Sequence, residues 1–305
     1  MTKTVSYFKS GIGNLIVATP ALQALASMDP SGKIDVCLAA KWKDSRVPAI
    51  RDILGGLPFV DQVVVHPGSM NGHYQTYFIP LQCEQSEAGK YIQQRTKLNR
   101  VRWPGDNWPA TKHHEIEANM RFVRALGYGG PTPPLYIPKA EGPILDLPRP
   151  IVGLCNSAFK SSIWAKKHWP YFGPLATAIK GWFGGSVVGV GGPGELDGIR
   201  LDVDFCGKLR FTETAKVISQ VDLFISTDTG CMHAADALKV PTIAIFGPTL
   251  TSKNGPVSKN SKVVQSRIGC APCQYSGMFY TCTVYLCMNS ISPGDVMREA
   301  RRMLA

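Results

Sequence analysis

The chain has 305 residues, about twice the size of a common domain, and this length predicts two domains. Hydrophobic residues make up 44% of it, and its 30 glycines and 23 prolines follow no repeat, which excludes a collagen-like or low-complexity protein. The formal net charge of +11 favours a polyanionic partner such as nucleic acid, anionic lipid or a phosphorylated glycolipid, although a basic surface without a specific partner gives the same signal.

The N-terminal half opens with an expected strand at 4–8, a glycine loop from Lys9 to Gly13, and a helix whose apolar residues recur every three or four positions as far as Leu25. Strand, glycine turn and helix are typical of the start of a Rossmann-like unit. Further strands are expected at 34–38, 60–65 and 77–81, and a helix at 115–126. The polar segment 84–109 has little periodicity and predicts a loop or an irregular lid.

Three prolines and two acidic residues within 140–150 indicate a linker, so the domains are expected at 1–145 and 146–305. After it we expect strands at 151–155, 186–190, 221–225 and 242–246, and helices at 171–180, 213–219 and 231–238. Strands alternating with helices in both halves predict an α/β fold with two parallel sheets. Ligands bind at the carboxyl ends of strands in such sheets.

The N-terminal residues show no basic segment followed by an apolar one, so they do not predict a signal peptide. The longest apolar runs, such as 240–246, are too short to cross a bilayer. Nine cysteines without a secretion signal are typical of a reducing compartment. We therefore expect a cytoplasmic protein without a transmembrane segment, whose positive charge allows peripheral contact with a membrane.

The segment 226–233, Ser-Thr-Asp-Thr-Gly-Cys-Met-His, is the first candidate binding site. Asp228 or Thr229 is expected to cap a helix whose first N–H groups face a ligand, and Gly230 lets an anion approach the backbone. His233 lies about one turn into this helix and can donate a hydrogen bond to a phosphate oxygen. A plain N-cap beside a partly buried histidine is the alternative interpretation.

Two further loops offer contacts to a nucleotide. The lysines of 165–170, Ala-Lys-Lys-His-Trp-Pro, can neutralise a pyrophosphate, and the hydroxyls of 156–162 can add hydrogen bonds. The segment 191–195, Gly-Gly-Pro-Gly-Glu, follows an expected strand, and its carboxylate can bind ribose hydroxyls. A solvated basic loop and a turn with a surface glutamate are the alternatives.

These three segments occur in an order that resembles the heptosyltransferase family, glycosyltransferase family 9. The run Val-Pro-Thr-Ile-Ala-Ile-Phe-Gly-Pro-Thr that ends at 249, the run Gly-Ile-Gly-Asn-Leu-Ile-Val-Ala-Thr-Pro-Ala-Leu that ends at 22, and the segment 114–127 are also similar to that family. The resemblance implies a GT-B architecture, in which two Rossmann-like domains face each other across a cleft. It also implies sugar transfer with inversion from a nucleotide-diphosphate sugar, typically ADP-heptose, without a catalytic divalent ion.

The resemblance assigns roles to individual residues of this chain. Lys167 would contact the diphosphate and Glu195 the ribose, while Asp228, Thr229, Gly230 and His233 would line the phosphate end. The N-terminal domain would bind the acceptor, with Ser10, Gly11, Gly13 and Asn14 forming the loop on the acceptor side.

One departure from the family affects catalysis. The family has Gly-Asp in its first loop, with the aspartate as the proposed general base, whereas this chain has Gly13-Asn14. An amide does not accept a proton at neutral pH, so Asn14 can orient the acceptor without deprotonating it. His114, His113 or Glu115 is expected to replace the base. The catalytic candidates are Asn14, His114, Lys167 and His233.

Two groups of residues suggest metal binding. Asp202-Val-Asp204 resembles the acidic pair of a metal-dependent glycosyltransferase, but an alternating strand would turn both carboxylates to the solvent. Cys270, Cys273, Cys282 and Cys287 follow C-x2-C-x8-C-x4-C, which can form a tetrahedral structural site for zinc or iron. Buried free cysteines or two disulfides are the alternatives. The remaining cysteines are expected in the cores: Cys37, Cys83, Cys155, Cys206 and Cys231.

The residues and the resemblance together predict an inverting glycosyltransferase. It would move a sugar from a nucleotide-diphosphate sugar, ADP-heptose-like or a UDP-sugar, to an anionic glycan such as lipopolysaccharide core. The charge, and aromatic residues beside basic ones at 102–103 and 112–114, also allow a phage-type enzyme that glycosylates hydroxymethylated DNA bases. Asn14 allows a third interpretation, a catalytically retired protein that binds sugar nucleotides.

Overall fold

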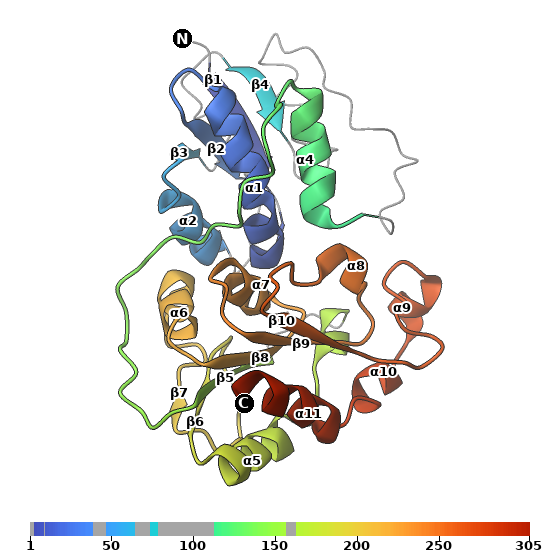
Figure 1. Cartoon of the computed structure of the whole chain (residues 1–305). Coiled ribbons are helices and arrows are strands. Elements are labelled where there is room, and N and C mark those ends of the chain that lie inside the picture. Colours follow the sequence, from blue (N-terminus) through green and yellow to red (C-terminus); the bar gives the residue numbers. More distant parts are fainter. Residues whose placement is uncertain (1–2, 9, 39–46, 65–73, 79–112, 157–162) are drawn as a thin grey trace. The chain divides into compact units, whose positions relative to one another are not determined.

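The computed structural model describes residues 3–8, 10–38, 47–64, 74–78, 113–156 and 163–305 (Figure 1). The chain divides into two compact units, Met1–Pro138 and Lys139–Ala305, with the boundary before the one expected after residue 145. The extended segment that follows is held on the second unit by Gln220, whose amide donates to Pro143 O at 2.8 Å and accepts from Leu145 N at 3.0 Å.

The N-terminal unit contains a parallel sheet with the strand order β3-β2-β1-β4. Its strands are β1 (Lys3–Phe8), β2 (Ile34–Leu38), β3 (Val60–Val64) and β4 (Tyr74–Phe78), and its helices are α1 (Ile12–Met28), α2 (Val47–Gly55) and α4 (Glu115–Ala125). The chain runs from β1 to β2 and β3 in one direction, and β4 adds on the other side of β1. In a parallel sheet of this order, ligands bind beyond the carboxyl ends of the strands where the direction changes, which here is between β1 and β4.

Helix α1 follows β1 directly, so its first turn lies at the carboxyl edge of the sheet. Leu15, Ile16, Leu22 and Leu25 are completely or almost completely buried, and α4 packs beside this helix (Figure 1). This burial stabilises the helix although it contains Pro20, which removes one backbone donor.

The C-terminal unit contains a parallel sheet with the strand order β10-β9-β8-β5-β6-β7. Its strands are β5 (Ile151–Cys155), β6 (Ser186–Gly189), β7 (Val203–Asp204), β8 (Leu223–Thr227), β9 (Thr242–Phe246) and β10 (Ser261–Gln265). Every residue of β5, β6, β8 and β9 is buried, as expected for a parallel sheet covered on both faces. The direction of strand addition changes between β5 and β8, so a ligand site is expected there.

Helices surround this second sheet (Figure 1). They are the 3-10 helix η2 (Trp164–Lys167) and the helices α5 (Phe172–Phe183), α6 (Phe211–Ile218), α7 (Gly230–Ala237), α8 (Thr251–Asn254), α9 (Gly277–Thr281), α10 (Leu286–Asn289) and α11 (Pro293–Leu304). In the described part of the chain, none of the helices has both the length and the apolar character that a membrane span requires.

Strand β8 begins two residues later than the sequence pattern predicts. The pattern includes Val221 and Asp222 in the strand, but Asp222 instead binds the start of β5. Its carboxylate accepts from Ile151 N at 2.7 Å, and its N–H donates to Ile151 O at 2.8 Å.

Candidate functional site

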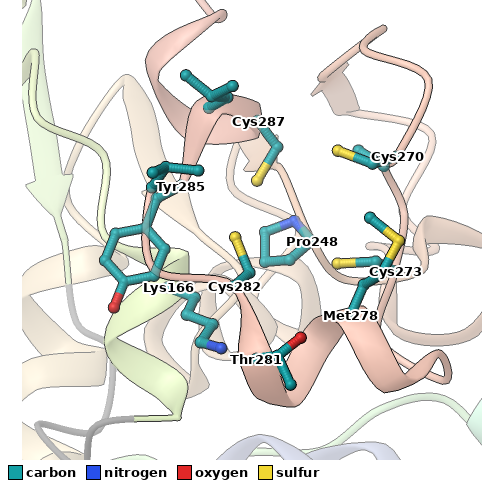
Figure 2. Close-up of a pocket in the computed structure, with 12 residues that line it drawn as sticks. Lys166, Pro248, Cys270, Cys273, Met278, Thr281, Cys282, Tyr285 and Cys287 are labelled. Atoms are coloured by element: carbon teal, nitrogen blue, oxygen red, sulfur yellow. The ribbon is translucent and has the colours of Figure 1, made fainter.

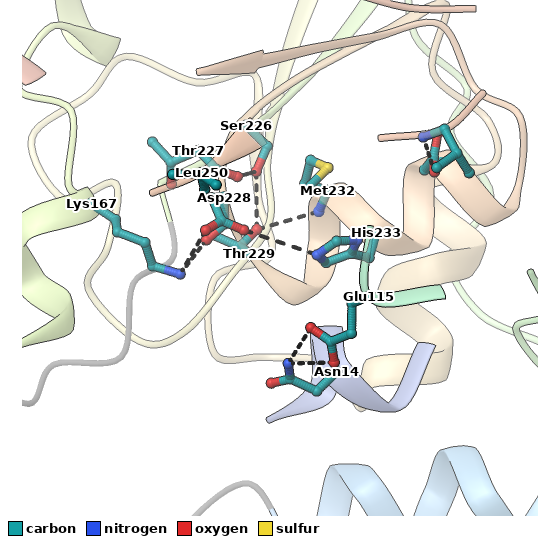
Figure 3. Close-up of polar contacts among 12 residues, drawn as sticks. Asn14, Glu115, Lys167, Ser226, Thr227, Asp228, Thr229, Met232, His233 and Leu250 are labelled. Atoms are coloured by element: carbon teal, nitrogen blue, oxygen red, sulfur yellow. Dashed lines mark hydrogen bonds and ion pairs between the residues drawn. The ribbon is translucent and has the colours of Figure 1, made fainter. Parts of the chain in front are cut away.

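The turn between β8 and α7 forms a helix N-terminus at the expected ligand edge of the C-terminal sheet (Figure 3). Thr229 is the N-cap, and its hydroxyl accepts from Met232 N at 3.3 Å. The same hydroxyl lies 3.1 Å from Ser226 Oγ, and Gly230 is the first residue of the helix. Since free N–H groups and the helix dipole favour negative charge here, the turn can receive a phosphate.

Lys167 and His233 lie beside Asp228, as Figure 3 shows. Lys167 Nζ donates to Asp228 O at 2.6 Å and lies 3.4 Å from Asp228 Oδ2. His233 Nε2 is 3.9 Å from Asp228 Oδ1. The structure therefore brings together three of the predicted donor-site residues from two separate segments, η2 after β5 and the turn after β8.

Asn156 positions the segment that carries Lys167, and the sequence motifs did not single out this role. Asn156 is buried at the end of β5, and its side chain accepts from Trp169 N and donates to Trp169 O, both at 2.9 Å. Its amide also lies 2.9 Å from His168 Nδ1. Trp169 is completely buried, and its ring N–H donates to Ile291 O at 2.9 Å. This buried anchor fixes the backbone directly after Lys167.

Thr227 and Thr249 are two further polar residues at the carboxyl ends of the strands. Thr227 is the last residue of β8, and Thr249 follows β9. Both side chains are almost completely buried, and neither hydroxyl has a hydrogen-bond partner among the described residues. A buried hydroxyl without a partner is costly, so a ligand oxygen at this edge would satisfy them.

Glu195 lies in the loop after β6, where the resemblance placed a ribose ligand. Gly191 and Gly194 have φ values of 142° and 72°, a region that favours glycine, and this backbone turns the loop back over the strand end. A Cβ at Gly192 would lie 2.9 Å from Glu195 Oε1, so the glycine leaves room for the carboxylate. Glu195 thus follows β6, which lies next to β5 in the sheet whose strands β5 and β8 precede Lys167 and Asp228.

The predicted acceptor loop lies in the N-terminal unit. Ser10, Gly11 and Gly13 surround the start of α1, and Asn14 lies in its first turn. Asn14 Nδ2 donates to both carboxylate oxygens of Glu115, at 3.0 and 3.2 Å (Figure 3). Glu115 is the first residue of α4 and is only 1% exposed.

The two neighbouring histidines make other contacts. His114 is the N-cap of α4, and its Nδ1 accepts from Ile116 N at 3.2 Å. His113 Nδ1 lies 3.1 Å from Glu117 Oε2. Glu115, one of the proposed substitutes for the missing aspartate, is thus brought to Asn14.

The acidic pair at the sheet edge has local structural roles. Asp202 is exposed, as expected, and accepts from Lys180 Nζ at 2.6 Å and from Val187 N at 2.7 Å. These hydrogen bonds outweigh the effect of partial burial and lower the pKa of Asp202. Asp204 is half-buried, which differs from the expectation, and accepts from Cys206 N at 2.9 Å.

The four clustered cysteines line one pocket of about 200 Å³ in the C-terminal unit (Figure 2). They are free thiols: Cys270, Cys273, Cys282 and Cys287. Backbone hydrogen bonds at Tyr285 and Val284 lower the pKa of Cys282, whereas burial raises the pKa of Cys287 to about 11. Within the described ranges, no group of three or more cysteine, histidine or acidic side chains is arranged to hold a metal ion. The thiols therefore share a pocket, but they do not form the tetrahedron that was expected.

Helix η2 connects this pocket with the Asp228 turn. Lys166 lines the pocket, is buried, and donates to Phe279 O of α9. Trp164 packs on Phe279 with ring centroids 5.5 Å apart, and Lys167 Nζ lies 5.2 Å from the Trp164 ring centroid. Successive lysines of one short helix thus contact the cysteine segment and Asp228. The other described cysteines, Cys37, Cys155, Cys206 and Cys231, are buried as expected, while Cys83 lies outside the described residues.

Sequence comparisons agree with these motifs. Residues 136–283 match the family model described as glycosyltransferase family 9 (heptosyltransferase). Lipooligosaccharide heptosyltransferase 2 of Campylobacter jejuni is 35% identical over 104 residues, which are 33% of this chain and 31% of the relative. Lipopolysaccharide heptosyltransferase 1 of Pseudomonas aeruginosa is 32% identical over 161 residues, 46% of this chain and 45% of the relative. The chain thus spans less than half the length of these curated relatives.

Solved structures of low sequence identity share the fold. The glycosyl transferase family 9 protein of Veillonella parvula has a TM-score of 0.72 at 16% identity, over 99% of this chain and 97% of that protein. E. coli heptosyltransferase WaaC with ADP has a TM-score of 0.70 at 16% identity, over 99% and 100% of the two chains. The iron-containing dodecameric glycosyltransferase TibC of E. coli has a TM-score of 0.68 at 15% identity, over 99% of this chain and 76% of that protein. Residues 136–283 of this chain are therefore similar to glycosyltransferase family 9, and the chain has the GT-B fold that the resemblance implied.

Proposed function

We propose that this chain is an inverting glycosyltransferase that transfers heptose from ADP-heptose to an anionic glycan of the lipopolysaccharide inner core. The observation that carries the proposal is the contact of Lys167, Asp228 and His233 around the N-terminus of α7. These residues lie where the C-terminal sheet changes direction, which is the expected place for a nucleotide in such a sheet.

The leaving group is the part of the donor that these residues stabilise. The N–H groups of α7 would bind the diphosphate, and Lys167 would neutralise part of its charge. His233 would donate a hydrogen bond to an oxygen on which negative charge develops as the glycosidic C–O bond breaks. Thr227 and Thr249 would add hydroxyl donors, and Glu195 would accept from the ribose hydroxyls.

The reaction would be a single displacement. An acceptor hydroxyl bound by the N-terminal unit attacks the anomeric carbon from the face opposite the diphosphate, so the configuration inverts. The stabilised diphosphate leaves with the electrons of the broken C–O bond, and no divalent ion is needed because lysine, histidine and helix N–H groups supply the positive charge.

The acceptor class rests on the relatives and on charge. The curated relatives are named for lipooligosaccharide and lipopolysaccharide, which supports a glycan rather than modified DNA. The net charge of +11 suits a phosphorylated acceptor and supports peripheral contact with an anionic membrane surface. The test below also includes DNA with hydroxymethylated bases, because positive charge attracts both a phosphorylated glycan and DNA.

The cysteine pocket would have a structural role. Lys166 lines the pocket and donates to Phe279 O of α9, and this contact would hold the helix that carries Lys167.

The test is sugar transfer measured by product mass. ADP-heptose and a UDP-sugar would each be offered with a heptose-deficient lipopolysaccharide core and with DNA that contains hydroxymethylated bases. We expect heptosylated core from ADP-heptose and no product in the other three combinations. A DNA product would overturn the acceptor class, and ADP binding without any product would show a retired enzyme.

A further inference from the structure

We propose that Glu115 is the general base of the transfer reaction, and that Asn14 holds its carboxylate in place; the assignment rests on the function proposed above. Asn14 occupies the first-turn position of α1, at the carboxyl edge of the N-terminal sheet and beside β1, where the direction of strand addition changes. Its amide reaches both oxygens of Glu115, at 3.0 and 3.2 Å. A carboxylate is therefore present within one hydrogen bond of the position at which the family resemblance predicts an aspartate.

The location of Glu115 suits a base. It begins α4, where the positive end of the helix dipole favours a negatively charged side chain. The residue is only 1% exposed, and a buried carboxylate that is held by a donor from another helix has little freedom to move. Since Asn14 donates to the carboxylate and is not itself a proton acceptor, the pair divides orientation and proton transfer between two residues.

The two histidines are less suited to this role. His114 Nδ1 accepts the N–H of Ile116, so in the neutral ring the lone pair that could take a proton caps α4 instead. His113 lies against Glu117, which also pairs with Arg121 on the half-exposed surface of the helix.

The proposed step balances without any other reactant. A lone pair of the acceptor oxygen forms the bond to the anomeric carbon, and the bond from that carbon to the diphosphate oxygen breaks. The proton of the acceptor hydroxyl passes to Glu115, and the nucleoside diphosphate leaves with the bonding electrons. Release of the proton to water restores the carboxylate.

The experiment exchanges the two residues. Wild type, Glu115→Gln, and the double variant Asn14→Asp with Glu115→Gln would be compared for turnover of ADP-heptose with the lipopolysaccharide core, for ADP binding, and for thermal unfolding. Loss of a general base reduces kcat about 10²- to 10⁴-fold, so Glu115→Gln should lose at least about a hundredfold. Its affinity for ADP should be unchanged, because the diphosphate-binding residues lie in the other unit.

The double variant should recover at least about tenfold of the lost kcat. It keeps one carboxylate and one amide at the same pair of positions, with the direction of the hydrogen bond reversed. Glu117→Gln is the matched control, since it removes a half-exposed carboxylate from the same helix and should keep the wild-type kcat.

Each outcome decides a different statement. A wild type that turns over, with Glu115→Gln within about threefold of its kcat, would overturn the base and leave the proposed function intact. A folded double variant with a kcat no higher than that of Glu115→Gln would also overturn the base assignment, because a carboxylate at this pair of positions would then not speed the reaction. A wild type without turnover on the core would overturn the proposed function and, with it, the base.

Discussion

Replacing Lys167 by methionine tests the diphosphate site most directly. The side chain is 16% exposed and Asp228 is 7% exposed, so their contact is largely shielded from water. Methionine keeps most of the apolar stem that lies against Trp164, and removes the ammonium group that donates to Asp228 O at 2.6 Å.

The size of the effect follows from the type of hydrogen bond. A charge-assisted hydrogen bond contributes about 1.5–3 kcal/mol. If Lys167 makes one such bond to the diphosphate, the Kd for ADP should rise about 10- to 150-fold in the variant. The free energy of unfolding should also fall, by about 1–3 kcal/mol, because the buried Asp228 carboxylate loses its cation.

Calorimetric titration with ADP would measure the binding, and urea unfolding the stability. Lys180→Met is the matched control, since it removes the same charge from α5, where Lys180 pairs with Asp202. If the lysine charge acted only through long-range attraction of ADP, the two variants would lose the same amount of ADP affinity. If Lys167→Met binds ADP as tightly as Lys180→Met, then Lys167 does not contact the diphosphate, and the donor site has to lie elsewhere.

Two further predictions concern other parts of the chain. Thr249→Val removes a buried hydroxyl without a described partner, so it should weaken ADP-heptose binding about 2- to 12-fold without lowering the stability of the free protein; equal binding in calorimetry would exclude the hydroxyl from the site. Asp29 is buried, which raises its pKa, but hydrogen bonds from Ser31 and Thr4 outweigh this and lower the pKa. Asp29 therefore stabilises the fold above the ordinary carboxyl pKa of about 3.9, and less as the pH falls through its lowered value. Urea unfolding should therefore show Asp29→Asn about 1–2 kcal/mol less stable than wild type at neutral pH and closer to it in acid, and a constant difference would contradict the argument.

The parallel core strands could be predicted from the sequence with accurate bounds. Strands β2, β5 and β9 have the predicted bounds, because a strand buried on both faces consists mainly of apolar residues. Strand β4 overlaps the predicted segment 77–81, whose last three residues lie outside the described part of the chain, and helix α2 was not predicted. Both are short elements in which few residues define the pattern.

The donor site was predicted largely from local motifs. Its residues directly follow the strands β5, β6 and β8, and each motif contains its own cap or glycine turn, so short-range sequence carries the information. The sequence analysis included Thr227 and Asn156 in candidate segments but assigned neither a role, because a threonine or an asparagine at a strand end has no motif of its own. Their roles depend on burial and on partners elsewhere in the chain.

The sequence by itself determined two α/β units, the parallel strands and a helix N-terminus at Asp228 or Thr229, because hydrophobic periodicity and capping act over a few neighbouring residues. Only the tertiary structure decided that Glu115 lies at Asn14, 101 positions away in the chain, and that the four cysteines surround a pocket without forming a tetrahedron. Such contacts depend on how helices from different parts of the chain pack together, and a one-dimensional pattern does not contain that information.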